Sequence, residues 1–339
     1  MQATPKQANL NTPLAGEDSS CLSAQSLAQI LAYHQRSKHK LERYAAGPEA
    51  LDWDAQPNPF REFAATPRIQ LPLVADQLTA SFDALHVPGA VAPHPITLDT
   101  VAALLELAFG LSAWKEYGPD RWAVRCNPSS GNLHPTEAYV ICRQITGLED
   151  GAYHYISRDH SIEQRCRYTT PQPDASPRLL VGLSSISWRE AWKYGERAFR
   201  YCQLDTGHAI GALRYAAATL GWSLHFEDRC SQQQIAQWLG LDRDADFIGA
   251  EREEAELLMK ITTGQPVNAA AASDLFESAQ THWHGKANIL DAHPMYRWPV
   301  IDEVTQATRK PLSPPVLAKP EETYPAIKRE GDTSNNRAG

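Results

Sequence analysis

The chain has 339 residues, of which 42% are hydrophobic and 21% are charged. This composition is typical of a globular protein, and the length allows one or two domains. The formal net charge of −8 argues against a nucleic acid or an anionic membrane as the main partner, because both would require a basic surface.

Targeting and redox signals are weak in this chain. The N-terminal sequence has no apolar signal segment, and the most apolar window, Val101 to Trp114, contains Glu106 and is too short to span a bilayer. The six cysteines are widely spaced and form no C-x-x-C pair, which is typical of isolated, reduced thiols. We therefore expect a cytoplasmic protein.

The N-terminal third combines a loose start, two helices and a wrapping segment. Residues 1–20 are polar, and we expect them to be flexible. Apolar residues at helical spacing predict a first helix over Ser23–His34. Residues 47–97 contain many prolines and little periodicity, which predicts an extended segment that wraps the core. A second helix is expected at Asp99–Leu111, with Thr97 or its own first residue as the N-cap.

Strands and one long helix follow. Alternating residues predict strands at Glu137–Arg143 and Ala152–Ile156. The strongest helix is Glu196–Leu220, whose apolar residues recur at helical spacing and which ends where Gly221 can cap it. The next expected elements are a strand, a helix and a strand, at Ser223–Phe226, Ser231–Leu239 and Glu256–Thr262. Because helices and strands do not alternate regularly and no G-x-G-x-x-G motif occurs, the pattern favours an α+β fold over a Rossmann arrangement.

The composition changes past residue 268. Residues 269–280 could form one more helix, and the aromatic residues that follow predict an arm over 269–309 that packs on the core. From residue 310 the sequence is rich in proline and charge, so we expect 310–339 to be disordered. The folded domain is accordingly predicted over residues 21–268.

The most distinctive stretch is Arg125 to Tyr139, RCNPSSGNLHPTEAY. It joins turn-forming residues with short hydroxyl and amide groups to the alternating sequence of a strand. Gly131 can adopt a positive φ and has no side chain, so a flat ligand could lie on the backbone there. From the residues alone, an ordinary surface loop is an equally good reading.

This stretch resembles the flavin-binding loop of the nitroreductase superfamily, in particular of the SagB-type dehydrogenases. A second long match is Trp188 to Trp222, WREAWKYGERAFRYCQLDTGHAIGALRYAAATLGW, and a weaker one comprises Tyr33–His39 and Leu51–Arg61. The blocks occur in the order of the family. The resemblance implies an α+β sandwich with a central, mainly antiparallel sheet flanked by helices. It also implies FMN as cofactor and a homodimer with the flavins at the subunit interface.

The resemblance assigns the cofactor to three groups of residues. A cationic cluster after the first helix matches the phosphate-binding position, although its Arg-Ser-Lys-His order departs from the common pattern and leaves open which cation binds phosphate. The loop matches the contacts to the ring and the ribityl chain, and the end of the long helix matches backbone contacts to the flavin edge. The implied residues are Arg36, Ser37, Lys38, His39, Pro128, Ser129, Ser130, Asn132, Leu220 and Gly221. From the residues alone, the cluster could be a basic helix end that complements the helix dipole.

Lys193 and Tyr194 are the catalytic candidates. They resemble a Lys-Tyr pair of azoline dehydrogenases, which oxidise heterocycles in ribosomal peptides, and that pair takes part in proton abstraction. A lysine beside Arg189 and Arg197 could have a lowered pKa and act as a base. The alternative is an ordinary helix start with an i,i+4 salt bridge between Glu196 and Arg200.

Other polar residues are expected to support the site. Asp205 and His208 lie one helical turn apart, and we expect a buried hydrogen bond between them that positions the long helix against the loop. His134 is expected to brace the loop, and Glu137 to anchor its strand by pairing with an arginine. The His282-Trp283-His284 segment could supply metal ligands, but no H-E-x-x-H motif accompanies it, so we expect no metal.

Three functions remain open. The first is an FMN-dependent SagB-type dehydrogenase that oxidises a small molecule or a peptide heterocycle by hydride transfer to flavin. The second is a nitro or quinone reductase that uses NAD(P)H. The third is a flavin-fold subunit of a biosynthetic complex that does not catalyse.

Overall fold

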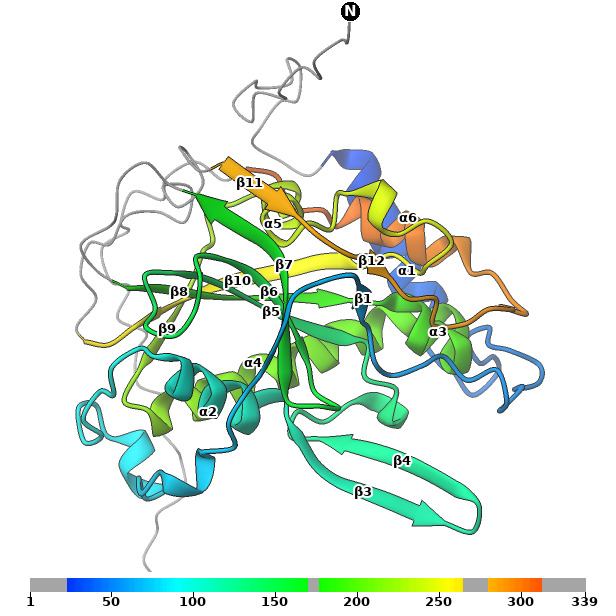
Figure 1. Ribbon diagram of the computed structural model, residues 1–339. Helices are drawn as coiled ribbons and strands as arrows, with labels where there is room; N and C mark the ends of the chain where they lie inside the picture. The colour runs from blue at the N-terminus through cyan, green and yellow to red at the C-terminus, as the bar shows by residue number, and fades with distance from the viewer. Residues whose placement is uncertain (1–22, 170–176, 265–279, 313–339) are drawn as a thin grey trace, which may run out of the picture.

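The structure of the protein is a computed structural model, and it describes residues 23–169, 177–264 and 280–312. Its centre is an eight-stranded sheet in the order β11-β7-β6-β5-β8-β10-β9, with β2 also paired to β7 (Figure 1). The strands are β2 Arg68–Gln70, β5 Thr136–Arg143, β6 Gly151–Ile156, β7 Ser161–Thr169, β8 Arg178–Ser185, β9 Ser223–Phe226, β10 Glu254–Thr262 and β11 Gln280–Trp283. Neighbouring strands run antiparallel, which confirms the predicted sheet and the α+β class.

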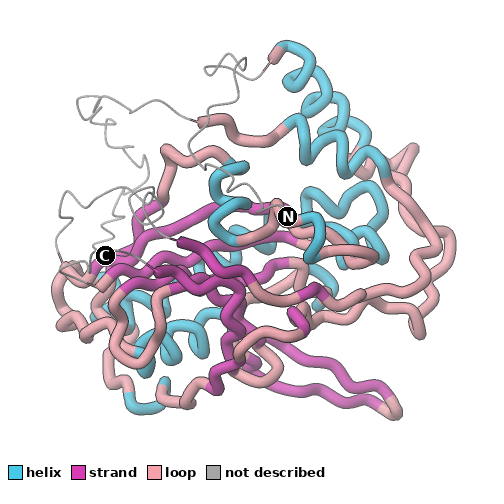
Figure 2. The backbone as a smooth tube through the Cα atoms, turned by 45° about the horizontal axis from the view of Figure 1, so that its top comes forward, coloured by secondary structure: helices cyan, strands magenta, loops and turns pink. Residues whose placement is uncertain are grey.

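Helices cover both faces of this sheet. In Figure 1, α2 and α4 lie below the sheet and α5 lies above it, and Figure 2 shows strands enclosed by helices from a second direction. The helices are α1 Ala24–Arg36, α2 Leu98–Phe109, α3 Ser187–Tyr194, α4 Ala198–Thr219, α5 Gln232–Leu239 and α6 Pro299–Ala307.

Strand β5 explains why both faces must be covered. Its eight residues are all buried. Val140 packs in the core under α2 and α4, whereas Tyr139 and Ile141 pack in the core under α5. Successive side chains of a strand point to opposite faces, so β5 is held from both sides. The loop that precedes it is therefore attached to one of the most rigid parts of the molecule.

The first of these covering helices, α2, is set by its caps. Thr97 is the N-cap, as predicted, and forms a capping box with Thr100. The helix ends at Phe109, two residues before the predicted end, because Gly110 leaves the helical conformation with a ψ of 166°.

The predicted long helix is confirmed as α4, whose observed bounds, Ala198–Thr219, lie within two residues of the predicted ones. Gly195 has a φ of 55° and ends α3, a single 3-10 turn follows, and α4 begins at Ala198. The apolar stripe that predicted this helix is buried, and it packs on α2 and the sheet of the same chain. Its burial does not require a second subunit.

One hairpin was not predicted from the sequence. Strands β3 (Leu111–Tyr117) and β4 (Asp120–Arg125) pair only with each other and project from the body in Figures 1 and 2. Three partly exposed aromatic side chains lie on this hairpin, namely Trp114, Tyr117 and Trp122. Strand β4 leads directly into the loop at residues 126–135.

The wrapping segment and the C-terminal region close the fold. Residues 47–97 contain only short elements, including β1 (Phe63–Ala64), which pairs with β12 (Lys286–Ala287). Strand β11 extends the main sheet at β7, and α6 packs against α1. The predicted flexible start, most of the predicted tail and the helix expected over 269–280, apart from Gln280 in β11, lie outside the described residues. Every helix in the described ranges is too short or too polar to cross a bilayer.

Candidate active site

The loop between β4 and β5 is a tight turn held by its own polar groups. Gly131, Asn132 and His134 have φ values of 62°, 59° and 52°. The Asn132 amide donates to the carbonyl of Ala123 at 2.7 Å. Its side-chain oxygen must then accept from His134 Nε2 at 3.0 Å, which places the imidazole proton on Nε2. Both polar ends of Asn132 are therefore engaged within the protein.

His134 braces this turn, as expected from the sequence. Its backbone N–H donates to the Ser129 hydroxyl at 2.8 Å, and its side chain is buried. Burial, and next the charge of Arg125, lower the pKa of His134 to about 3. The imidazole is therefore neutral near pH 7.

Asp205 of α4 ties the loop to the helix. Its carboxylate accepts from the Ser129 hydroxyl at 2.7 Å, and from the Ser130 backbone N–H and hydroxyl at 3.1 Å. Asp205 is buried, whereas His208 is exposed and makes no hydrogen bond to it. The expected positioning of the helix against the loop is present, but Asp205 achieves it through the two serines.

Tyr194 of the predicted catalytic pair lies against the same loop. A Cβ on Gly131 would lie 2.5 Å from the Tyr194 hydroxyl oxygen, so this tyrosine touches the loop backbone. Burial, and next the charge of Glu190, raise the pKa of Tyr194, so its hydroxyl stays protonated near pH 7. Lys193 is half-buried, and its Nζ lies 5.6 Å from the Trp53 ring centre and 5.7 Å from that of Tyr194.

The cationic cluster forms where α1 meets the start of α4. Ser37 is buried and donates its hydroxyl to the Tyr33 carbonyl at 2.7 Å. The same hydroxyl accepts from Arg200 Nε at 2.7 Å, and the Ser37 carbonyl accepts from Arg197 Nη1 at 2.5 Å. Arg197, directly before α4, and Arg200, in α4, thus join Lys38 and His39. Lys38 is half-buried and His39 is exposed.

Arg36 has a different partner from the rest of the cluster. Its guanidinium binds both carboxylate oxygens of Glu196, one of them at 2.8 Å. Arg200 donates instead to Ser37 and His34. The i,i+4 pair between Glu196 and Arg200 considered from the sequence is not formed.

The electrostatics of the cluster favour an anion. The charge of Lys38 is the main cause of a lowered pKa at the exposed His34, with smaller contributions from burial and from Arg200. Burial and the charge of Arg197 lower the pKa of His39. Both lowered pKa values mean that the surroundings disfavour a further positive charge on these histidines. A phosphate dianion would be stabilised by the same potential.

The cluster and the loop belong to one continuous surface. The Arg197 guanidinium lies 5.3 Å from the Tyr201 ring centre and donates to its hydroxyl at 3.3 Å. The Tyr201 ring packs on that of Tyr194 with centres 4.4 Å apart, and Tyr194 touches Gly131. Residues that are far apart in the sequence therefore line one path from Ser37 to the loop.

Leu220 and Gly221 do not join this surface within one chain. They follow the C-terminal end of α4, a 22-residue helix, so about 33 Å of helix separates them from the cationic cluster. The buried Leu220 accepts from the His94 N–H at 3.0 Å. A Cβ on Gly221 would lie 2.7 Å from the carbonyl oxygens of Val91 and Ala92, so close packing requires this glycine.

A buried ionic network supports the loop from below. Arg189 is buried, forms an ion pair with Glu137 and donates to the His134 carbonyl at 2.7 Å. Burial alone would raise the pKa of Glu137, but Arg189 and Arg125 hold it well below its usual range. Glu137 thus anchors its strand through an arginine, as expected. Arg189 faces inward to this carboxylate and is therefore not available to Lys193.

The network continues to His154 in β6. Its two ring nitrogens lie 2.9 Å from Glu137 and 2.9 Å from Glu163. Burial would lower the pKa of His154, but the hydrogen bonds to these two carboxylates raise it to about 9. The network therefore carries a buried imidazolium between two glutamates.

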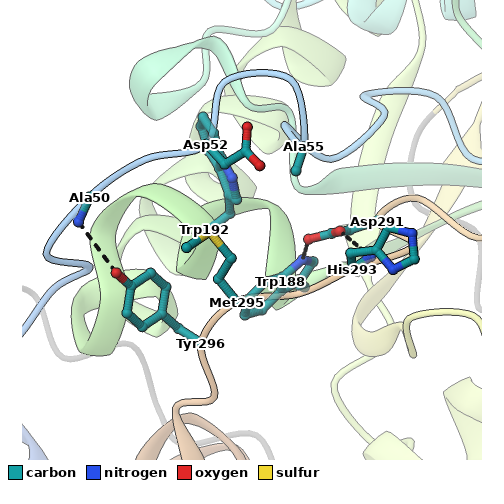
Figure 3. A pocket seen from close by; sticks show the side chains of 9 residues that line it. All are labelled: Ala50, Asp52, Ala55, Trp188, Trp192, Asp291, His293, Met295 and Tyr296. Carbon is teal, nitrogen blue, oxygen red and sulfur yellow. Dashed lines mark hydrogen bonds between the residues drawn. The ribbon is translucent and has the colours of Figure 1, made fainter.

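A pocket lies beside α3, and none of the predicted cofactor residues lines it (Figure 3). Its cavity volume is about 10 Å³, which is room for about one water molecule and not for a cofactor. The Trp188 indole donates to Asp291 at 2.8 Å on one wall, and Tyr296 accepts from the Ala50 N–H at 3.3 Å on another. We regard this pocket as a packing gap and do not assign the cofactor to it. The described residues contain no group of three or more His, Cys, Asp and Glu arranged to hold a metal ion.

Comparisons with known proteins were made against families, curated proteins and solved structures. Residues 90–252 match the model of the Nitroreductase family. A Methanocaldococcus jannaschii protein assigned as a nitroreductase, MJ1384, is 28% identical over 138 residues, which cover 38% of this chain and 66% of that protein. The trifolitoxin-processing protein TfxB of Rhizobium leguminosarum bv. trifolii is 26% identical over 193 residues, which cover 50% of this chain and 52% of that protein.

A solved structure supports the fold. The crystal structure of an Anabaena variabilis protein assigned as a nitroreductase aligns with a TM-score of 0.55 and 24% identity, over 72% of this chain and 48% of that one. At this identity the similarity establishes the fold alone. The chain spans between half and two thirds of the length of the curated relatives it matches.

Proposed function

The chain contains a nitroreductase-family domain over residues 90–252, and on that premise we propose that it is an FMN-dependent oxidoreductase of the SagB type. The proposed reaction is oxidation of a small molecule or a peptide heterocycle. The observation that carries the proposal is the continuous path from the cationic cluster at Ser37, through Tyr201 and Tyr194, to the loop at Gly131. The similarity to a trifolitoxin-processing protein supports the choice of substrate class.

The cluster supplies the donors that an FMN phosphate requires. A phosphate dianion is bound by several charge-assisted hydrogen bonds. We assign this role to Lys38, Arg197 and Arg200, because the guanidinium of Arg36 is already paired with Glu196. The lowered pKa of the exposed His34 supports a positive potential at this position.

The loop would receive the ring through its backbone. The side chains of Ser129 and Ser130 bind Asp205, and that of Asn132 binds Ala123 and His134. The exposed Pro128 ring and the backbone at Gly131 are therefore the parts of the loop left for a ligand. Leu220 and Gly221 could reach the same cofactor only from a second copy of the chain, so the proposal includes a homodimer.

The chain's own residues must handle the proton that leaves the substrate. When bound, the flavin would accept a hydride from the substrate carbon. The accompanying proton needs a base, and the amine of Lys193 is the candidate, because this side chain makes no hydrogen bond or close ion pair with the described residues. Tyr194 keeps its proton near pH 7 and would act as a hydrogen-bond donor beside it.

A reductase that uses NAD(P)H is the second candidate. The similarity to a protein assigned as a nitroreductase favours it. This chemistry would require an open flavin and little acid–base assistance, so it would not depend on Lys193.

The first experiment measures cofactor binding. The purified chain is titrated with FMN and with riboflavin, which lacks the phosphate, and its mass is measured by light scattering. We expect tighter binding of FMN and a dimer of the 37.6 kDa chain. Lys38→Gln should weaken binding of FMN but not of riboflavin, whereas the control Lys115→Gln, on the exposed hairpin, should change neither. A protein that binds neither compound, or a Lys38→Gln variant that binds both as the parent does, would contradict the proposed site.

The second experiment separates the reactions. The FMN-loaded protein is mixed anaerobically with a thiazoline or oxazoline compound, or with NADH or NADPH, and bleaching of the flavin absorption is followed. Bleaching by the heterocycle supports the dehydrogenase. Bleaching only by a nicotinamide, followed by reoxidation with a nitro compound, would replace it by the reductase. A loaded protein that reacts with none of them would support the non-catalytic alternative.

A further inference from the structure

The buried carboxyl group of Glu190 has no role in the function proposed above. Glu190 lies in α3, one turn before Lys193, and is 0% exposed. Neither of its carboxyl oxygens receives a hydrogen bond from a described residue. A carboxylate that is buried without a donor is strongly unfavourable, so this group needs a physical explanation.

The groups that face Glu190 come from its own helix and from α4. The carboxyl of Asp205 interacts with Glu190 from α4, through its charge and through a hydrogen bond between the two side chains. Lys193 and Tyr194 interact with Glu190 from α3, and the buried Cys202 thiol interacts with it from α4. Of these groups, Lys193 is the one that can carry a positive charge.

The two carboxyl groups have very different surroundings. Asp205 accepts hydrogen bonds from both hydroxyls of Ser129 and Ser130 and from the Ser130 backbone N–H. These donors stabilise its ionised form. Glu190 has no such donor, and two adjacent buried carboxyls cannot both be ionised without strong repulsion. The shared proton therefore belongs on Glu190, which can then donate to Asp205.

We propose that Glu190 is a positioning residue that acts as a carboxylic acid, donating a hydrogen bond to Asp205 and so holding Asp205 where it fixes the Ser129–Ser130 loop. The chain of contacts runs from α3, through the Asp205 carboxylate of α4, to the loop. The proposal rests on the proposed function only for the identity of the ligand that the loop receives.

The charges around the pair agree with this arrangement. Burial, and next the charge of Asp205, raise the pKa of Glu190 to about 9, against the opposing charge of Lys193. Burial also raises the pKa of Asp205, but its hydrogen bonds from Ser129 and Ser130 oppose the rise. Glu190 is thus the group that holds the proton at pH 7, and it loses that proton only near pH 9.

The test measures amide hydrogen exchange of the loop in protein that contains no flavin. Exchange of the peptide covering residues 126–135 is measured from pH 7 to 10 and corrected for the intrinsic rate, with a β5 peptide as the internal reference. In the parent protein we expect loop protection to fall about tenfold through pH 9, because the hydrogen bond from the neutral Glu190 acid to the charged Asp205 carboxylate is lost. In Glu190→Gln, whose amide donates at every pH, the loop peptide should stay protected over the whole pH range. In Glu190→Met, which has no donor, the loop peptide should be unprotected both at pH 7 and at pH 10.

Infrared spectroscopy supplies an independent readout of the proton. The difference spectrum between the parent protein and Glu190→Gln at pH 7 should contain the carbonyl band of one protonated carboxylic acid, which disappears through pH 9. Loop protection in the parent that does not change with pH would overturn the proposal, as would a difference spectrum without that band. The pH series on the parent protein decides the question even if a variant does not fold. Because no flavin is present, failure to bind FMN would leave this result unaffected.

Discussion

The hydroxyl oxygen of Tyr194 lies 2.5 Å from the position that a Cβ on Gly131 would occupy. The contact joins the end of α3 to the loop before β5. It requires glycine for two separate reasons, since Gly131 also has a φ of 62°. The candidate catalytic tyrosine and the candidate cofactor loop therefore constrain each other directly.

Gly131→Ala should destabilise the protein through both effects. A left-handed residue with a Cβ costs roughly 1–2 kcal/mol, and the collision with Tyr194 should bring the total loss to about 3 kcal/mol. Gly118→Ala is the matched control, because Gly118 has a φ of 60° but a Cβ there meets nothing within 4 Å. Urea unfolding of the two variants measures the difference.

Removal of the tyrosine hydroxyl tests the origin of that difference. In a Tyr194→Phe background the excess loss caused by Gly131→Ala should shrink, because the closest atom is gone. An equal loss for Gly131→Ala and Gly118→Ala would show that the tyrosine contact carries no energy.

Periodicity in the sequence predicted much of the fold. Alternation along β5 identified the central strand, because each of its faces meets a separate core. The recurring apolar residues of α4 identified the long helix because they form the buried stripe that packs on α2 and the sheet. Such predictions succeed where burial is dictated by residues close together in the sequence.

The candidate site contains partners that no local pattern reveals. Asp205 was recognised as a positioning residue, but its partners Ser129 and Ser130 lie 75 residues or more away. Glu190 was not recognised, because a carboxyl in an eight-residue amphipathic helix reads as solvent-facing until α4 is placed over it. Its only sequence signal is the one-turn spacing to Lys193.

The predicted long helix began at Glu196, close to the observed start of α4 at Ala198, but the prediction included neither α3 nor the reason for the break between α3 and α4. At Gly195 the cause is tertiary: a Cβ there would lie 2.5 Å from Gly47 Cα and 2.6 Å from the Ala46 carbonyl oxygen. The wrapping segment thus passes directly against this residue, and the Glu196 N–H donates to the same carbonyl at 3.1 Å.

Gly195→Ala should consequently destabilise the protein by about 3 kcal/mol or more, because backbone atoms cannot move aside as a side chain can. Gly207→Ala in α4 gives the opposite expectation, since its Cβ would meet nothing within 4 Å. Replacing glycine by alanine inside a helix should stabilise by about 0.5–1 kcal/mol. Thermal and urea unfolding would compare them, and a neutral Gly195→Ala would rule out the close approach of the wrapping segment.

The buried imidazolium of His154 makes stability depend on pH. Its pKa is raised from 6.5 to about 9 in the folded protein, so the folded state binds the proton more tightly. The stabilisation is complete below pH 6.5 and is lost as the pH rises through 9, with a total on the order of 3 kcal/mol.

His154→Gln should remove this dependence. The free energy of unfolding of the parent minus that of the variant should fall between pH 6.5 and 9, and contributions from Glu190 cancel in this difference. His225→Gln, in β9 of the same sheet, serves as the control. A parent-minus-variant difference that stays constant over this range would mean that His154 is not charged in the folded state.

Lys193 offers the sharpest test of the proposed reaction. If its amine takes the substrate proton, Lys193→Ala should lower the rate of substrate oxidation by about 10²–10⁴-fold, the usual contribution of a general base. FMN affinity should be unchanged, because Lys193 lies outside the cationic cluster. Lys193→Arg separates chemistry from packing, since a guanidinium can keep the cation over the Trp53 ring but stays protonated and cannot accept a proton. Both variants should therefore be slow in single-turnover reduction by the heterocycle. Recovery of the rate in Lys193→Arg would instead assign Lys193 a purely structural role against Trp53.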